Sequence, residues 1–196
     1  HLEAWPWPVK VHTLGRFSLT IDDEPLSFSS RAQKKPLDVL KIILSGGGSN
    51  VSEASVADLL WPEADGDMAM QAFATNLHRL RKLLGRPDAV LLLNGILSLD
   101  PKLCWIDARA FELSLGKAED LWDKAESEEE FDKACELISS ALSLYKGEFL
   151  PDEDFIPDAI AMRGHLHTRF LQGLYNLGEH LIRSGRYEEA HQSLER

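Results

Sequence analysis

The first thirty residues alternate apolar and polar positions in the manner of β-strands. Two runs show this alternation: Val9 and Val11 in the first, and Phe17, Leu19 and Ile21 in the second. Asp22 and Asp23 follow the second run and are typical of a tight turn. The pattern predicts an amino-terminal antiparallel sheet.

The apolar spacing then becomes helical. One face of the first helix carries three leucines: Leu37, Leu40 and Leu44. Three glycines at 46–48 end this helix. We expect it to begin near Lys34 or Lys35, because Pro36 fits only within a first turn.

Two more helices are expected before residue 90. The shorter one lies within 51–62, with Ser52 as its N-cap and Pro62 at its end. The longer one runs from about Met68 to Leu84 and is ended by a glycine.

This third helix is basic on its outer side. Four apolar residues lie within about 60° of one another and form its buried stripe: Phe73, Leu77, Leu80 and Leu84. The opposite side carries polar and basic residues: Gln71, Thr75, His78 and Lys82, with Arg79 beside them. Such a helix can enter a DNA major groove, where side chains hydrogen-bond base edges and meet phosphates. A solvated helix face that merely happens to be basic is the alternative.

A change of pattern near residue 100 separates the chain into two parts. The segment 89–100 predicts a β-hairpin, because two short apolar runs are joined by Asn94 and Gly95, a favoured type I′ pair. From Asp107 onward the apolar residues recur at helical spacing throughout. We therefore place the boundary between the parts near 101–106.

Charge divides the chain in the same place. The net charge is −11 overall, −2 over residues 1–100 and −9 over residues 101–196. The acidic balance disfavours non-specific nucleic-acid binding, so any contact with nucleic acid must be local.

Composition indicates an ordinary globular, cytoplasmic protein. No run approaches the ~18 apolar residues of a membrane span, and no leader resembles a signal peptide. Cys104 and Cys135 are too few for a disulfide framework and are expected to be reduced core residues. The chain begins without Met and ends within a helical pattern, so we expect a fragment of a longer protein.

Four segments of the first part carry a resemblance to a known family: LGRFSLTIDDEPLSF, KKPLDVLKIIL, VSEASVADLLWPEADGD and NLHRLRKLLG. Through them residues 9–100 resemble the OmpR/PhoB-type winged-helix DNA-binding domain, in the version found in SARP-like bacterial transcriptional activators. The resemblance implies an amino-terminal sheet, three helices and a carboxyl-terminal β-hairpin wing.

In that family the third helix is the recognition helix. The resemblance therefore places five residues at the groove: Gln71, Thr75, Asn76, His78 and Arg79. The helical pattern independently selects most of these residues, together with Lys82, whereas Asn76 lies at the edge of the buried side. Lys34 and Lys35 are further candidates for phosphate contacts at the start of a helix, with ordinary solvated lysines as the alternative.

The predicted wing departs from the family pattern. Its sequence, LLLNGILSL, has no basic residue, whereas family wings often carry an arginine into the minor groove. This argues against minor-groove contact by the wing.

Residues 174–194 have the spacing of a tetratricopeptide repeat. Eight positions agree: Leu174, Leu177, Gly178, Leu181, Gly185, Tyr187, Ala190 and Leu194. The small residues Gly178 and Ala190 are expected to let the two helices of the repeat approach closely. Together with CWIDARAFE and ALSLYKGEFLPDEDFIPD, this pattern makes residues 107–196 resemble the bacterial transcriptional activator domain.

The resemblance also implies partners. In SARP-like regulators the helical domain packs against the winged helix and takes part in self-association or in contacts with the transcription machinery. The loop PEADGD lies where related regulators can touch RNA polymerase, although its acidic character fits simple solvation equally well.

Signs of enzymatic chemistry are missing from the sequence. It contains no phosphate-binding glycine loop, metal-type His/Cys cluster or nucleophile elbow, so we expect no catalytic residue, cofactor or metal. His165 and His167 form an H-x-H pair, but two positions apart on a helix they point to different faces.

The sequence thus predicts an α+β winged helix-turn-helix domain over 9–100, followed by an all-α tetratricopeptide-like domain over 107–196. The expected function is that of a transcription regulator, in particular an activator, that binds double-stranded operator DNA. We expect direct-repeat operators, a homo-oligomer on DNA, and a sensor or receiver domain outside this fragment. The alternative is a protein-interaction module whose winged helix no longer binds DNA.

Overall fold

The computed structural model describes residues 5–28 and 31–194, and its amino-terminal part is built on a mixed four-stranded sheet. The strands, in spatial order, are β3 (Glu24–Pro25), β2 (Ser18–Ile21), β1 (Val9–His12) and β7 (Cys104–Ile106). β1 pairs antiparallel with β2, so that Val11 lies opposite Leu19. β7 pairs parallel with the other edge of β1, so that Val11 also lies opposite Ile106.

The predicted antiparallel strands are confirmed, and the sheet has one strand more than expected. Asp22 and Asp23 adopt φ angles of 48° and 66° and form the predicted tight turn. The added strand, β7, lies in the segment 101–106 that was expected only as a boundary. Its three residues are all buried, so they show no alternation that would mark a strand.

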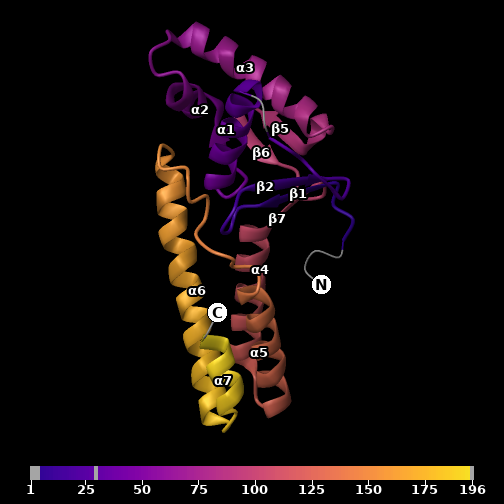
Figure 1. Ribbon diagram of the computed structural model, residues 1–196, viewed down its shortest axis with the longest axis vertical. Helices are drawn as coiled ribbons and strands as arrows, with labels where there is room; N and C mark the ends of the chain where they lie inside the picture. Colours follow the sequence, from indigo (N-terminus) through magenta and orange to yellow (C-terminus); the bar gives the residue numbers. More distant parts are fainter. Residues whose placement is uncertain (1–4, 29–30, 195–196) are drawn as a thin grey trace.

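Three helices and a second sheet complete this part (Figure 1). The helices are α1 (Arg31–Ser45), α2 (Glu53–Leu60) and α3 (Gly66–Leu83), with a 3₁₀ turn, η1 (Pro87–Ala89), after α3. The second sheet contains, in spatial order, β4 (Val51–Ser52), β6 (Ile96–Leu99) and β5 (Val90–Leu93). β5 and β6 form the predicted hairpin, and Asn94 and Gly95 have the positive φ angles, 52° and 78°, of a type I′ turn.

The helix starts follow local capping chemistry, and two of them lie earlier than predicted. Ser52 is the N-cap of α2, as expected. Asp65 caps α3 by accepting a hydrogen bond from the Met68 amide at 3.1 Å, so that helix starts at Gly66. The prediction that α1 begins near Lys34 is wrong: it begins at Arg31, and Pro36 lies in its second turn. The proline ring removes one backbone donor there, which leaves the carbonyl of an exposed first-turn residue free to meet water.

The second part is entirely helical, as predicted. Its helices are α4 (Asp107–Lys124), α5 (Glu128–Leu142), α6 (Pro157–Arg183) and α7 (Tyr187–Leu194). Figure 1 shows that α6 runs from beside α1 to the far end of the molecule, and it contacts α1, α4, α5 and α7 on the way. None of the helices within the described residues is long and apolar enough to cross a membrane.

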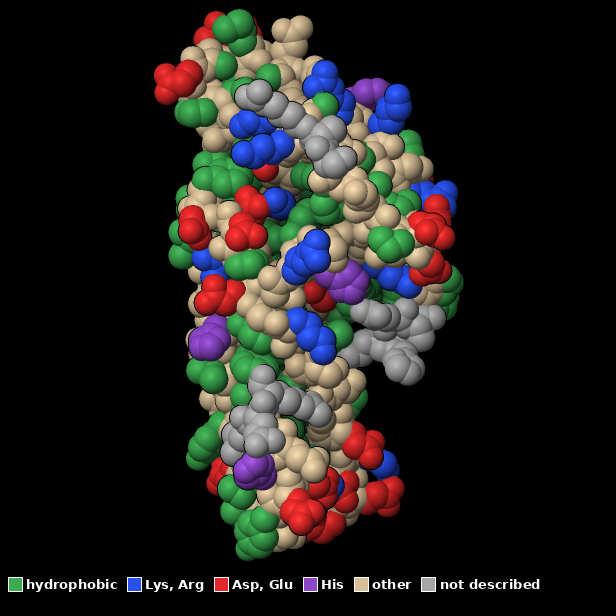
Figure 2. All heavy atoms as spheres, viewed as in Figure 1, with side chains coloured by type: hydrophobic (Ala, Val, Ile, Leu, Met, Phe, Trp, Pro, Cys, Tyr) green, Lys and Arg blue, Asp and Glu red, His purple; other side chains and the backbone are tan. Residues whose placement is uncertain are grey.

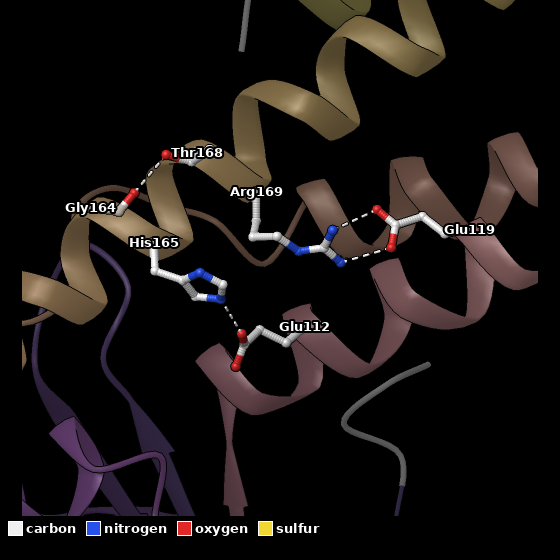
Figure 3. Close-up of polar contacts among 6 residues, drawn as sticks. All are labelled: Glu112, Glu119, Gly164, His165, Thr168 and Arg169. Atoms are coloured by element: carbon white, nitrogen blue, oxygen red, sulfur yellow. Dashed lines mark hydrogen bonds and ion pairs between the residues drawn. The ribbon is translucent and has the colours of Figure 1, made fainter.

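Polar contacts join α6 to α4 (Figure 3). The Arg169 guanidinium donates to both carboxylate oxygens of Glu119, at 2.6 and 2.9 Å. His165 Nε2 lies 2.8 Å from Glu112 Oε1. His167, in contrast, lies beside the Tyr145 hydroxyl, so the two histidines meet different neighbours, as their spacing predicts.

Close packing of α6 depends on a glycine that the sequence pattern did not single out. A Cβ atom added at Gly173 would lie 3.2 Å from side-chain carbons of both Leu115 and Leu142. A Cβ atom added at Gly178 would meet nothing within 4 Å. The expectation that Gly178 permits close helix approach is therefore wrong, because the tight contact falls five residues earlier, where α6 faces α4 and α5.

The two parts share one buried core rather than meeting at a thin linker. Asp107, the first residue of α4, accepts hydrogen bonds from Thr13 N, Thr13 Oγ1, Leu14 N and Ala108 N. Burial raises the pKa of this carboxyl, and the hydrogen bonds oppose that shift. A largely buried ion pair between Lys41 of α1 and Glu153, in the loop before α6, joins the parts again.

Candidate nucleic-acid interface

Helix α3 packs one face against the other two helices of the winged-helix part. Its buried residues include Ala69, Phe73, Leu77 and Leu80, and the helix contacts both α1 and α2. These positions recur every three or four residues, so burying them turns the opposite face outward. Figure 1 places that helix at the end of the molecule farthest from the α4–α5 turn.

Five of the residues predicted to contact DNA lie exposed on this outer face: Gln71, Thr75, His78, Arg79 and Lys82. Four of them, Gln71, His78, Arg79 and Lys82, make no side-chain hydrogen bond or ion pair to another described residue. The Thr75 hydroxyl donates to the Gln71 carbonyl at 2.9 Å, which leaves its oxygen able to accept a bond. The face therefore carries two positive charges, on Arg79 and Lys82, that no ion pair with a described residue neutralises, and polar side chains lie beside them.

The sixth α3 residue of the prediction, Asn76, lies elsewhere. Only 8% of its surface is exposed, and its Nδ2 donates to the Ala72 carbonyl at 2.8 Å. The prediction that Asn76 contacts the groove is therefore corrected. The residue lies within the buried stripe of α3, and its side-chain amide is hydrogen-bonded to the helix backbone.

Two nearby arginines that look equivalent in sequence are occupied within the fold. Arg81 donates from Nε and Nη2 to the Val90 carbonyl, at 3.0 and 2.8 Å, and so ties α3 to the first strand of the wing. Arg86 donates to Asp22 at 2.7 Å. The free basic charge on α3 therefore consists of Arg79 and Lys82.

The two lysines of α1 differ in the same way. Lys35 donates to the Leu60 carbonyl at 3.1 Å and lies over the Trp61 ring, 5.6 Å from its centre. Lys34 is exposed and makes no side-chain hydrogen bond or ion pair with another described residue. Because α1 begins at Arg31, both lysines lie after the first three helical positions, away from the free amides of the helix terminus.

The helical pattern could have identified two further exposed positions. Met68 and Ala74 lie exposed on the same outer side of α3 as the predicted residues. Ala74 has no long side chain to keep a duplex at a distance, and Met68 extends the face toward the helix start. The helical periodicity indicates that both residues are exposed, but a search restricted to polar side chains does not select them.

The tip of the wing is apolar. Leu93 is 68% exposed and Ile96 is 40% exposed, and they flank the Asn94–Gly95 turn. The amide of Glu53 donates to the Gly95 carbonyl at 2.9 Å, which fixes this turn against the start of α2. The wing thus presents hydrocarbon where a basic side chain would be needed to meet phosphate.

Charge is distributed unevenly over the visible face of the molecule. Figure 2 shows Lys and Arg side chains over the region where Figure 1 places α1 and α3, with a few acidic side chains at the tip of the same end. Acidic side chains gather at the opposite end, around the turn between α4 and α5. The electrostatic potential therefore favours approach of a polyanion to the α3 end.

Comparisons with known proteins give one match for the helical part and one for nearly the whole chain. Residues 106–196 match the family described as "Bacterial transcriptional activator domain". A solved structure, "Mycobacterium tuberculosis EmbR in complex with low affinity phosphopeptide", is similar at 20% sequence identity with a TM-score of 0.71. That likeness covers 96% of this chain and 49% of the other, so this chain spans about half the length of the solved one. A search of curated proteins gave no match.

The family match confirms the activator domain predicted for the helical part. The structural match confirms the predicted fold class for nearly the whole chain, and at this level of identity it speaks to the fold alone.

Proposed function

We propose that this chain, which carries a bacterial transcriptional activator domain over 106–196 and has the make-up of a SARP-like regulator, binds operator DNA in a sequence-specific manner and regulates transcription. The observation that carries the proposal is the outer face of α3. It is exposed and carries Gln71, His78, Arg79 and Lys82, whose side chains no other described residue occupies, while the exposed carboxylate of Asp67 lies in the first turn of the helix.

In this proposal the residues of α3 divide the work of recognition. Arg79 and Gln71 hydrogen-bond base edges in the major groove, and Thr75 contacts a base through its oxygen or its methyl group. Lys82 and His78 meet phosphates and set the register of the helix on the duplex. Lys34 adds a phosphate contact from α1, and Asn76 contributes only to the packing of α3.

The chain then consists of a DNA-binding domain over 9–100 and an activator domain over 107–196. The parallel strand β7 completes the sheet of the first domain with residues that follow the wing. Through β7 and Asp107, the DNA-binding domain is held rigidly to α4.

The salt dependence of DNA binding tests this proposal. Fluorescence anisotropy with a labelled duplex should show log K falling linearly with log salt, because each neutralised phosphate releases about one counterion. Lys82→Ala should weaken binding to all duplexes alike and reduce that slope by about one. Lys124→Ala removes the same charge from α4 and should change neither. A flat salt dependence, or equal slopes for wild type and Lys82→Ala, would contradict the phosphate contact.

Operator architecture is a second part of the proposal. Related winged helices assemble head to tail, so we expect a homo-oligomer on direct repeats spaced by about one helical turn or half a turn. DNase footprinting should show two protected half-sites in the same orientation. An inverted repeat, or one isolated half-site, would refute this arrangement.

The acidic loop between α2 and α3 is the proposed contact with RNA polymerase. Glu63 and Asp65 are exposed in this loop, beside the start of α3. Figure 1 shows the loop between α2 and α3 at a distance from β1. Glu63→Ala should leave DNA affinity unchanged and lower transcription from a bound operator in a reconstituted assay. Unchanged transcription would remove this loop from the proposal; Asp65 is unsuited to the test because it caps α3.

A protein-interaction module is the second candidate function. The apolar wing tip favours it, because Leu93 and Ile96 suit a protein surface better than phosphate. An interaction module of this kind should not bind DNA at any salt concentration. The anisotropy experiment would then show no binding even at low salt.

A further inference from the structure

A cavity of about 310 Å³ lies where the amino-terminal sheet meets α4. Trp7 and Pro101 line it from one side, Trp105 and Ile106 of β7 from another, and Leu113 of α4 from a third. Its lining includes no residue of α3, so it is separate from the proposed DNA-binding face.

Two polar groups in the wall of this cavity have no partner. Trp105 is only 4% exposed, and its Nε1–H is buried without a hydrogen bond to any described residue. Such orphaned donors are rare in folded proteins, because burial removes their water without replacing it. Ser114, a buried residue of α4, also makes no side-chain hydrogen bond within the described chain. Ser114 lines the cavity, so an acceptor atom inside it can reach the Ser114 hydroxyl, whereas the Trp105 Nε1–H stays buried in the wall.

Trp7, Pro101 and Cys104 add apolar surface to the wall. The Trp7 indole donates from Nε1 to the Pro101 carbonyl at 3.0 Å, so its N–H is occupied and its ring is held at the cavity. Cys104 also lines the cavity, and burial raises the pKa of its thiol to about 12. The thiol is therefore neutral near pH 7 and offers contact surface rather than reactivity.

Two cations stand at the edge of the cavity. Arg109 and Lys117 line it one turn before and one turn after Leu113, so the three side chains form a single row along α4. Both cations are exposed and make no ion pair or hydrogen bond with another described residue. The α4 carboxylates Glu112 and Glu119 are turned toward α6, where they pair with His165 and Arg169 (Figure 3).

We propose that this cavity binds a small aromatic carboxylate. The aromatic ring would lie between Trp7 and Leu113, and the carboxylate would meet Arg109 and Lys117, with an oxygen within reach of the unpartnered Ser114 hydroxyl. The cavity equals roughly ten water volumes of about 30 Å³ each, which suits a molecule of about a dozen non-hydrogen atoms. The site joins β7 to α4, so an occupant would bridge the DNA-binding and activator parts.

The tryptophan indole signals of the full chain provide a direct test. The chain has five tryptophans, which give separate ¹H–¹⁵N indole signals that Trp→Phe variants assign. Titration with 4-phenylbutanoate should move the signals of Trp7 and Trp105 to saturation with a millimolar or tighter Kd. The signals of Trp61 and Trp122, which lie outside the cavity lining, should stay in place.

Charge dependence separates the proposed site from general hydrophobic binding. The neutral analogue 4-phenylbutan-1-ol should bind at least about fivefold more weakly, because it cannot pair with the two cations. Arg109→Gln and Lys117→Gln should each raise the Kd of the carboxylate by about threefold or more, the effect of a partly exposed charge pair. Lys124→Gln removes the same charge from the same helix beyond the cavity and should leave the Kd unchanged.

Three results would overturn the proposal. These are unmoved Trp7 and Trp105 signals up to about 10 mM carboxylate, equal affinity for the alcohol and the carboxylate, and equal affinities for Lys124→Gln and the two cavity variants. Each variant's spectrum without ligand shows whether it is folded, so loss of binding can be distinguished from loss of structure.

Discussion

Arg79 and Arg81 lie two residues apart on α3 but have different roles. Two positions on a helix are about 200° apart, so when Arg79 faces outward Arg81 is turned toward the wing. Arg79 has no partner among the described residues, and Arg81 binds the Val90 carbonyl twice. Of these two arginines, Arg79 is therefore available to the proposed interface, and Arg81 stabilises the fold.

This difference predicts that two charge-removing substitutions affect stability to different extents. Arg81→Ala deletes two charge-assisted hydrogen bonds and should lower the free energy of unfolding by about 1–3 kcal/mol. Lys82→Ala, the adjacent residue, should change it by less than about 0.5 kcal/mol because its side chain contacts only solvent. Urea unfolding of the two variants measures both values. Equal unfolding free energies for the two variants would show that the Arg81 hydrogen bonds do not stabilise the fold.

At the residue scale, periodicity predicted which side of α3 faces outward but not the partners of its side chains. Asn76 lies at the border of the stripe, where a helical wheel cannot distinguish an exposed amide from one bonded to Ala72. Similarly, Arg86 pairs with Asp22, 64 residues earlier in the chain. A local sequence pattern cannot predict that contact, because it depends on the tertiary packing of α3 against the amino-terminal sheet.

At the element scale, α6 shows how one helix can be tight against its neighbours at one glycine and open at another. Gly173 faces Leu115 and Leu142, whereas Gly164 has nothing within 4 Å of an added Cβ. Both glycines lie inside the same helix, so they lose the same backbone freedom on folding. Only the packing around them differs.

Substitution by alanine should therefore act in opposite directions at these glycines. Gly173→Ala should destabilise the protein by about 1–3 kcal/mol, because a methyl group must be accommodated against two leucine side chains. Gly164→Ala should stabilise it by about 0.5–1 kcal/mol through the better helix propensity of alanine. Thermal unfolding of both variants tests this pair, and a stabilising Gly173→Ala would contradict the tight contact.

The buried carboxyl of α1 gives a prediction for pH. Burial raises the pKa of Asp38 from 3.8, although Lys41 nearby opposes the shift and Glu153 adds to it. The folded state therefore holds this proton more tightly than the unfolded state, so the contribution to stability is present below pH 3.8 and is lost as pH rises through the raised pKa.

Asp38→Asn should remove this dependence. The difference in unfolding free energy between wild type and variant should shift in favour of the variant as pH rises from about 4, and level off above the raised pKa. Urea unfolding at a series of pH values measures the difference. A constant difference across that range would show that Asp38 titrates as it does in the unfolded chain.

Elements with strong local signals were predictable, and those defined by distant partners were not. Asn94 and Gly95 determine the hairpin because few other pairs adopt two positive φ angles. β7 is a strand only because β1 offers a free edge, and its three buried residues carry no periodicity. The sequence also placed Tyr187 in the tetratricopeptide pattern, yet its side chain is 67% exposed.

At the scale of the whole molecule, the two parts act as one body with charge separated along it. The shared core, β7, and the Asp107 and Lys41 contacts hold the winged helix to the helical part. Free cations lie on α3, and carboxylates concentrate at the far turn between α4 and α5. Composition predicted this division, since the net charge changes from −2 to −9 near residue 100.

Selection of binders from a random duplex pool tests the central claim, that α3 reads DNA sequence, most directly. The full chain should enrich one sequence motif, and Arg79→Ala combined with Thr75→Ala should lose that motif while remaining folded. Each lost base contact should cost about 1–3 kcal/mol of discrimination. If neither protein enriches any sequence even at low salt, or if the double variant enriches the same motif as the wild type, α3 is not the reader and the claim fails.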